Sequence, residues 1–148
     1  MLVSQALSDV FEPVEIEDIV QAVKYAEIES SCEFKVHVDR KCTENSLQRA
    51  NNLFYELNVD KTQRKNGILF YLAVDCRRFV IVADDHVRQT VPENFWDDIY
   101  AVMLKYFRKR HFAAGLSEAI LLAGEKLKPF FPWFRGDVNE VNDNISME

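Results

Sequence analysis

The chain has 148 residues, of which 48% are hydrophobic and 28% are charged. A chain of this length and composition forms one globular domain whose core needs neither disulfides nor a structural metal. Its 18 Lys and Arg against 24 Asp and Glu give a net charge of −6. This charge argues against a nucleic-acid binder, which gains affinity by neutralising phosphates, and favours cations and basic surfaces as partners.

The three cysteines, Cys32, Cys42 and Cys76, have neither the even number of a disulfide framework nor the CxxC spacing of a zinc site. We therefore expect free thiols, buried or half-buried, in a reducing compartment. The N-terminus lacks the pattern of a secretory signal, and no apolar run approaches the ~20 residues of a membrane span. The sequence predicts a cytoplasmic protein that is not inserted in a membrane, and we expect a monomer.

The first half of the chain predicts a helix followed by a strand. Residues 13–30 form an amphipathic helix, because their apolar side chains recur every three to four positions. Pro13 suits the first position of that helix. Residues 33–39 then alternate, with apolar side chains at even-numbered positions, which predicts a strand with one covered face.

A second helix and a hairpin follow. Thr43 and Asn45 can cap the helix, and residues 58–66 are a polar loop. Residues 67–74 are continuously apolar, as in a strand covered on both faces. Residues 78–83 form a third strand, and the short connection to it allows only an antiparallel hairpin.

The last third of the chain predicts two helices. A long helix begins at Pro92 after a connecting segment, Gly115 interrupts it, and a final helix ends before Pro129. The aromatic start of the tail should pack against the domain, and its end should be mobile. We predict one domain over residues 1–148 with an ordered core over about 11–135.

The predicted fold is α/β, a three-layer α/β/α sandwich with two helices on each side of a small mixed central sheet. The first two strands run parallel and the third runs against them. The end of the third strand therefore lies at the same edge as the beginnings of the other two. Asp84 and Asp85 leave the third strand at this edge, Glu27 and Glu29 end the first helix there, and Glu33 begins the first strand.

Clustered carboxylates repel one another unless a base, solvent or a cation compensates. Hard divalent cations such as Ca²⁺ and Mg²⁺ take oxygen ligands from carboxylates, carbonyls and water. We therefore expect a divalent-cation site at this edge, with Asp84 as the leading ligand and Asp85 and Glu27 as further metal ligands.

The loop before the second strand brings polar side chains to the same edge. We expect them to lie behind the metal ligands or to contact an anion; they are Thr62, Arg64 and Asn66. The alternative interpretation is structural: Asp84 and Asp85 merely end a strand, and Arg64 neutralises them.

Other chemistry is less well supported. The chain lacks the EF-hand loop, the phosphate-binding GxxxxGK[ST] and GxGxxG patterns, and the GxSxG elbow. His37, His86 and His111 lie in separate segments, where surface roles are expected. Trp96 and Trp133 are expected to be packing residues, although Trp133, in the segment FPWF, could mark a contact surface for another protein.

Three segments resemble, in order, the motifs of the TPM domain family. They are IVQAVKYAEIESSCEFKVHV, KTQRKNGILFYLAVDCRRFVIVADD and the closing DVNEV. The resemblance covers roughly residues 11–142. It implies an α/β/α sandwich, the divalent-cation binding of some relatives, and the acid-phosphatase activity proposed for the plant branch.

The family motifs fall on the edge described above. The motif Glu is Glu27, the motif Asp after the third strand is Asp84, and the loop motif includes Lys61, Thr62, Arg64, Asn66 and Gly67. Two family glycines are replaced, by Cys32 and His86, and a residue with a side chain adopts positive φ less readily than glycine does.

Three functions are therefore considered. The first is a cation-binding or protein-interaction module without catalysis. The second is a metal-assisted acid phosphatase acting on phosphate esters, in which Asp84 and Asp85 hold the cation and Arg64 or Lys61 balances charge. The third is a structural partner domain that uses the FPWF tail or the basic end of the long helix.

Overall fold

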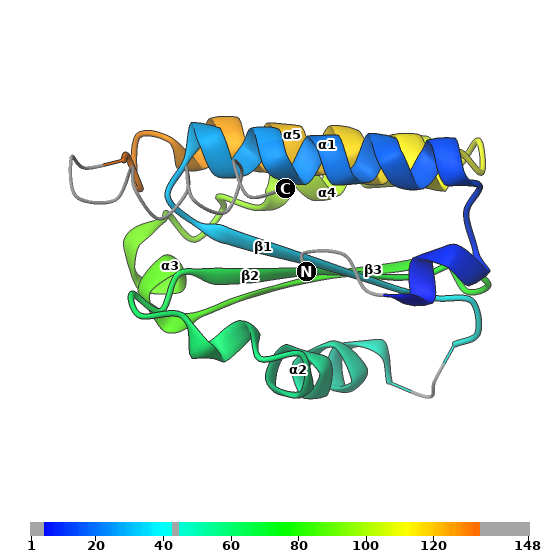
Figure 1. Cartoon of the computed structure of the whole chain (residues 1–148), viewed down its shortest axis with the longest axis horizontal. Coiled ribbons are helices and arrows are strands. Elements are labelled where there is room, and N and C mark those ends of the chain that lie inside the picture. Colours follow the sequence, from blue (N-terminus) through cyan, green and yellow to red (C-terminus); the bar gives the residue numbers. More distant parts are fainter. Residues whose placement is uncertain (1–4, 43–44, 134–148) are drawn as a thin grey trace.

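The computed structural model describes residues 5–42 and 45–133 and forms three layers (Figure 1). In the described part of the chain, one face of the sheet is covered by three helices, α1 (Pro13–Glu29), α4 (Asp97–Phe107) and α5 (Phe112–Leu127), and the other by α2 (Ser46–Glu56). The α/β sandwich prediction is confirmed. The prediction of two helices on each side is wrong, because the last two helices both pack on the side of α1.

The sheet has the predicted topology. Its strands are β1 (Glu33–Asp39), β2 (Gly67–Ala73) and β3 (Arg78–Ala83), with β2 in the centre. β2 runs parallel to β1 and antiparallel to β3. Every residue of β2 is buried, as its continuous apolar sequence predicts.

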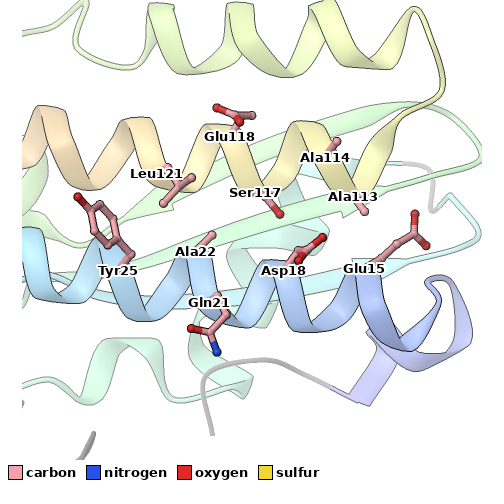
Figure 2. A pocket seen from close by; sticks show the side chains of 10 residues that line it. All are labelled: Glu15, Asp18, Gln21, Ala22, Tyr25, Ala113, Ala114, Ser117, Glu118 and Leu121. Atoms are coloured by element: carbon pink, nitrogen blue, oxygen red, sulfur yellow. The ribbon is translucent and has the colours of Figure 1, made fainter.

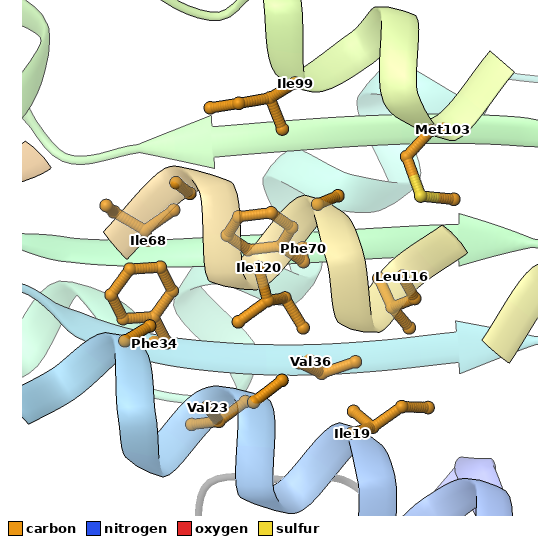
Figure 3. Close-up of a cluster of buried hydrophobic side chains, with 14 of the residues drawn as sticks. Ile19, Val23, Phe34, Val36, Ile68, Phe70, Ile99, Met103, Leu116 and Ile120 are labelled. Carbon is orange, nitrogen blue, oxygen red and sulfur yellow. The ribbon is translucent and has the colours of Figure 1, made fainter. Parts of the chain in front are cut away.

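The larger core lies between the sheet and helices α1, α4 and α5. Phe34 of β1 and Phe70 of β2 stack with their ring centroids 5.7 Å apart, and Ile19 and Val23 of α1 face β1 while Ile120 of α5 lies over β2 (Figure 3). The alternation predicted for β1 is confirmed on this face, where its even-numbered side chains are fully buried.

A smaller core lies under α2. Leu53 and Phe54 of this helix pack on Leu69 and Tyr71 of β2. The predicted cap is confirmed at Asn45, whose side chain accepts a hydrogen bond of 3.0 Å from the backbone N–H of Gln48. Thr43, the other predicted cap, lies outside the described residues.

The long helix does not begin at Pro92, which corrects the prediction. A short helix, α3 (Asp85–Thr90), occupies the connecting segment, and α4 begins only at Asp97. The N–H of Phe95 donates to the carbonyl of Pro92 and closes a turn there. The two aspartates in the first turn of α4 suit the positive end of its dipole.

Gly115 lies inside α5 and does not interrupt the helical segment there, which is a second correction. A Cβ at Gly115 would lie 2.6 Å from the Cβ of Tyr106 on α4. Gly124 permits a similar approach on the other side of α5, where a Cβ would lie 2.6 Å from the Cα of Ala26 on α1. The glycines therefore serve helix packing.

Cys42 and Cys76 form a disulfide, with their Cα atoms 5.9 Å apart, so the expectation of free thiols is wrong for these two residues. Asp39 pairs with Ala73 in the sheet, and each cysteine lies three residues beyond that pair. The parallel register brings them together although they are 34 residues apart in sequence. The cytoplasmic location, which depended partly on free thiols, stays a prediction.

The C-terminal end of the described chain packs as predicted. Phe131 is buried, and its carbonyl accepts a hydrogen bond of 2.8 Å from the N–H of Ser31. The predicted mobile end, from residue 134 onward, lies outside the described residues. Within residues 5–42 and 45–133, every helix is too short or too polar to cross a bilayer.

The close approach of α5 to α1 predicts the effect of adding a methyl group at its centre. We expect Gly124→Ala to lower the free energy of unfolding by about 1–2 kcal/mol, since overpacking against the backbone of Ala26 outweighs the gain in helix propensity. Urea unfolding checks this. Glu118→Ala, on the exposed side of α5, is the matched control and should leave stability within about 0.5 kcal/mol.

Candidate functional site

The end of the sheet where β1 and β2 begin and β3 ends, here named the Asp84 edge, gathers distant segments as the topology predicts. Glu33 pairs with Gly67, and the N–H of Asp84 donates to the carbonyl of Gly67 at 2.9 Å. Glu27 reaches the same edge, where its Oε2 accepts a hydrogen bond of 2.8 Å from the N–H of Phe34. Asp84 and Glu27 are therefore at the same end of the sheet.

Three side-chain oxygens near this edge are buried and have no hydrogen-bond partner among the residues that the structure describes. They are Oδ1 of Asp60, Oδ1 of Asn66 and Oδ2 of Asp84, here named the three unpaired oxygens. Such atoms are rare in folded proteins, because a buried acceptor without a donor costs about 1–3 kcal/mol, and more if it is charged. Each of these oxygens is therefore a position where a bound water or ion would gain a favourable contact.

The segments that carry these oxygens meet at Gly67. Asn66 precedes it in sequence, and the backbone of Asp84 is hydrogen-bonded to it. Asp60 follows Val59, whose carbonyl oxygen would lie 2.3 Å from a Cβ on residue 67. Glycine is required at this position because it lets the short helix η2 (Val59–Lys61) approach the start of β2.

Asn66 is held in place by its other polar atoms. It is 4% exposed, its Nδ2 donates to the carbonyl of Ser31 at 2.6 Å, and its N–H donates to Oγ1 of Thr62 at 3.1 Å. These two bonds orient the amide and leave its oxygen unpaired. Thr62 thus acts on the site through Asn66.

The predicted metal ligands do not share one environment. Oδ1 of Asp84 caps α3 by accepting from the N–H of Asp85 at 2.7 Å, and its Oδ2 is unpaired. Asp85 is exposed and forms an ion pair with Arg88. One oxygen of Glu27 is already engaged with the backbone of β1. Asp84 is thus the predicted ligand with an available buried oxygen.

The side chain of His86 contacts the backbone of Arg64 near this edge. Nδ1 of His86 donates to the carbonyl of Arg64 at 2.9 Å, and the imidazole packs on Phe131 with ring centroids 5.2 Å apart. His86, which replaces a family glycine, thus joins the loop before β2 to the C-terminal segment. Nε1 of Trp133 donates to the carbonyl of Glu27 at 3.1 Å, so this segment also fastens the end of α1.

Sequence reasoning missed Asp60 as a site residue. It stands in the polar loop directly before Lys61, where the family motif begins, and a lone aspartate in a loop carries no signal by itself. Its position beside Gly67 follows from the packing of η2 on β2. Within the described part of the chain, no three His, Cys, Asp or Glu side chains converge as a metal-binding group.

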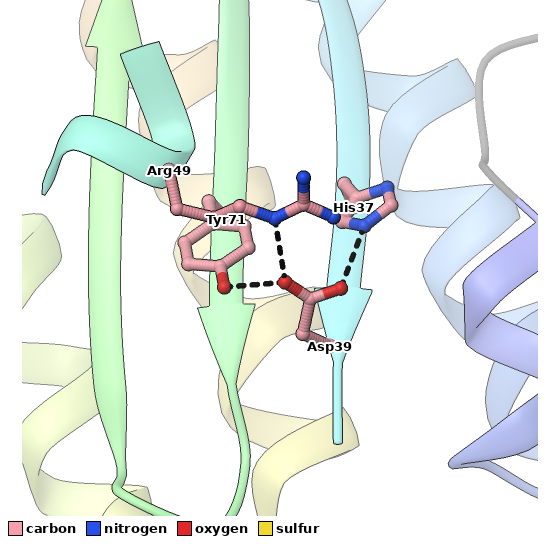
Figure 4. Close-up of polar contacts among 4 residues, drawn as sticks. All are labelled: His37, Asp39, Arg49 and Tyr71. Atoms are coloured by element: carbon pink, nitrogen blue, oxygen red, sulfur yellow. Dashed lines mark hydrogen bonds and ion pairs between the residues drawn. The ribbon is translucent and has the colours of Figure 1, made fainter. Parts of the chain in front are cut away.

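A second polar cluster lies at the opposite end of β1, under α2 (Figure 4). The carboxylate of Asp39 accepts hydrogen bonds from Nε2 of His37 at 2.9 Å, Nε of Arg49 at 3.0 Å and the hydroxyl of Tyr71 at 2.6 Å. Burial opposes ionisation of Asp39, but these three donors outweigh it and lower its pKa. The cluster joins β1, β2 and α2.

His37 is buried, which corrects the expectation of a surface role. Its ring lies nearly parallel to that of Tyr71, its neighbour on β2, at a centroid distance of 6.1 Å. Nδ1 of His37 is buried and has no hydrogen-bond partner within residues 5–42 and 45–133. The sequence places His37 and Asp39 on one face of β1, but only the seating of α2 shows that this face is covered.

A pocket of about 650 Å³ lies between α1 and α5 (Figure 2). Its rim carries Glu15, Asp18 and Glu118, and its wall includes Ser117, whose hydroxyl oxygen is buried without a partner. Glu15 also accepts a hydrogen bond from the N–H of Glu12 and so caps α1. The negative rim favours positively charged groups over anions.

The Asp39 cluster predicts a pH-dependent loss of stability. We expect Asp39→Asn to lower the free energy of unfolding by about 2–3 kcal/mol at pH 7, because the ionised partner of Arg49 is removed. The folded-state pKa of Asp39 is lowered, so its contribution is present above the unfolded pKa of about 3.9 and is lost as the pH falls through the folded value.

Urea unfolding of both proteins between pH 7 and pH 2 measures this difference, which should shrink as the pH falls. Asp98→Asn is the control, because Asp98 forms an exposed ion pair with Lys126 and should contribute less than about 1 kcal/mol. A difference that does not change with pH would contradict the prediction.

Comparisons with known proteins show which domain family this chain is similar to. The TPM domain profile matches residues 5–126. The NMR structure of the BA42 protein from the psychrophilic bacterium Bizionia argentinensis is 33% identical, covers 86% of this chain and 88% of its own, and superposes with a TM-score of 0.81. The N-terminal domain of a P. gingivalis protein shares the fold at 21% identity and a TM-score of 0.70, over 86% of this chain and 81% of its own.

No curated protein matches the sequence. The domain match spans most of the chain, and the BA42 protein shares sequence and fold over most of both chains. The chain therefore belongs to the TPM domain family.

Proposed function

We propose that this TPM domain is a binding module for a divalent cation, Ca²⁺ or Mg²⁺, at the Asp84 edge. The observation that supports the proposal is the set of three unpaired oxygens on segments that meet at Gly67. They belong to two carboxylates and one amide, which are ligands that hard cations prefer. A cation would compensate the negative charge of Asp60 and Asp84, each of which has one buried oxygen without a donor among the described residues.

The proposed ligands are Asp84, Asp60 and Asn66. Asp84 keeps the leading role that the sequence predicts, and Asn66 changes from a supporting residue to a ligand. Asp85 and Glu27 are not included, because Asp85 pairs with Arg88 and Glu27 accepts a backbone hydrogen bond. Three protein oxygens leave room for water, which both cations, and Mg²⁺ in particular, retain in protein sites.

A cation at this edge would add a link between three segments that backbone contacts already bring together. They are η2, the loop before β2 and the start of α3. The start of α3 also reaches the C-terminal segment, because His86 packs on Phe131. We infer that cation binding orders a surface made by these segments, which suits a module that presents a cation-dependent face to another protein.

Titration with Ca²⁺ and with Mg²⁺, followed by amide NMR shifts, tests the proposal. We expect shifts at residues 60–67 and 83–86, and we expect Asp84→Asn to weaken the affinity at least tenfold by removing a charged ligand. Asn can still cap α3, so this substitution should not unfold the helix. Asp85→Asn is the matched control and should change the affinity less than threefold. Unchanged shifts at millimolar cation would refute the proposal.

Cation binding also predicts a gain in stability that depends on concentration. At a cation concentration of 100 Kd, the free energy of unfolding should rise by about 2.7 kcal/mol, because the ligand binds the folded chain alone. Urea unfolding with the cation and with a chelator measures this gain. Asp60→Asn should reduce the gain strongly, whereas a full gain in this variant would exclude Asp60 as a ligand.

Phosphatase chemistry, the alternative function, would use the same cation. Asp85 is paired with Arg88, and Nζ of Lys61 lies 3.9 Å from Oδ2 of Asp60, so a phosphoryl group would have to compete with these two ion pairs. Hydrolysis of p-nitrophenyl phosphate in Mg²⁺, measured for the original chain and for Asp84→Asn, decides between the two functions. Turnover lost in this variant would favour the phosphatase.

A further inference from the structure

We propose that the Cys42–Cys76 disulfide is a site of thiol–disulfide exchange that controls how firmly α2 is attached to the sheet. The bond joins the segment between β1 and α2 to the turn between β2 and β3. Cys42 is exposed and Cys76 is half-buried. An exposed disulfide sulfur is accessible to an attacking thiolate, whereas buried structural disulfides resist exchange.

The exchange needs a low-molecular-weight thiol such as glutathione. Its thiolate attacks Sγ of Cys42, the bond between the two cysteine sulfurs breaks, and Cys76 leaves as a thiolate that takes a proton from water. A second thiolate then attacks the external sulfur of the mixed disulfide and releases Cys42. Overall, two thiols are oxidised to one disulfide and the two cysteines are reduced.

Cys32 does not compete in this exchange. It is 1% exposed, and burial raises the pKa of its thiol to about 12, so it carries almost no thiolate near neutral pH. Cys32 stands directly before β1, and Cys42 stands three residues after its last residue, so the two cysteines lie at opposite ends of this strand. The disulfide therefore cannot pass to Cys32 within the folded chain, and an external thiol is required.

The two layers of helices differ in how they are held. On the side of α1, α4 and α5, glycines let the helices approach closely over the larger core. On the other side, α2 contributes three buried residues to the smaller core and, among the described residues, an ion pair between Arg49 and Asp39. Asp39 ends β1 and is held by its pairing with Ala73 of β2, whereas the disulfide, three residues further on, anchors Cys42, from which the chain continues to α2.

Reduction should therefore loosen α2 first. The bond closes a loop across a sequence separation of 34 that contains α2, η2 and β2. Because β2 is paired with β1 and β3 along its length, α2 is the long element of this loop that can open locally. For loops of this size, chain entropy limits the effect of cross-linking on an opening equilibrium to roughly 10²- to 10³-fold. Since the opening of α2 is local, we expect its amides to exchange about 10- to 100-fold faster after reduction. This inference does not depend on the proposed cation site.

Hydrogen exchange of the full chain, before and after treatment with reduced glutathione, tests the proposal. Alkylation after denaturation should label one cysteine in untreated protein and three in reduced protein. Exchange should accelerate in α2, residues 46–56, and remain unchanged in α1 and α5. Cys42→Ser combined with Cys76→Ser should show the fast exchange with and without glutathione, and Cys32→Ser should respond as the original chain does.

Three results would overturn the proposal. Three labelled cysteines in protein purified without reductant would show that the bond does not form. Unchanged exchange in α2 after reduction would show that the bond does not control this helix. Equal acceleration in all helices, or a double variant that does not fold, would show that the disulfide stabilises the whole domain and not α2 separately.

Discussion

The burial of β2 on both faces is the constraint on which the rest of the structure depends. A strand with every side chain buried needs helices on both sides of the sheet and backbone partners on both of its edges. β1 and β3 supply the backbone partners, one parallel and one antiparallel. This arrangement also determines that segments far apart in sequence meet at the entry of β2.

The two faces of β2 are covered in different ways. One face bears three closely packed helices, which Gly115 and Gly124 allow to approach one another. The other face bears α2, whose small core is supplemented by the buried carboxylate of Asp39 and by the Cys42–Cys76 bond. The carboxylate of Asp39 and the disulfide therefore stabilise the face of the sheet that buries fewer apolar side chains. The proposed exchange acts on this face.

The candidate cation site arises at the entry of β2 because Gly67 has no side chain. η2, the loop before β2 and the end of β3 all contact this residue, and each contributes one of the three unpaired oxygens. Family resemblance and topology point to Asp84 and to this edge. They do not point to Asp60, because a loop aspartate has no periodicity that could place it.

Much of the fold follows from local patterns that the sequence carries by itself. Apolar periodicity and short connections determine helix α1, the three strands and the hairpin. The directions of the three strands, and the end of the sheet at which Asp84 lies, could therefore be predicted. The tertiary structure alone decided which face each later helix covers, the pairing of Cys42 with Cys76, and the burial of His37. These features depend on contacts between distant residues, and periodicity within a segment does not encode such contacts.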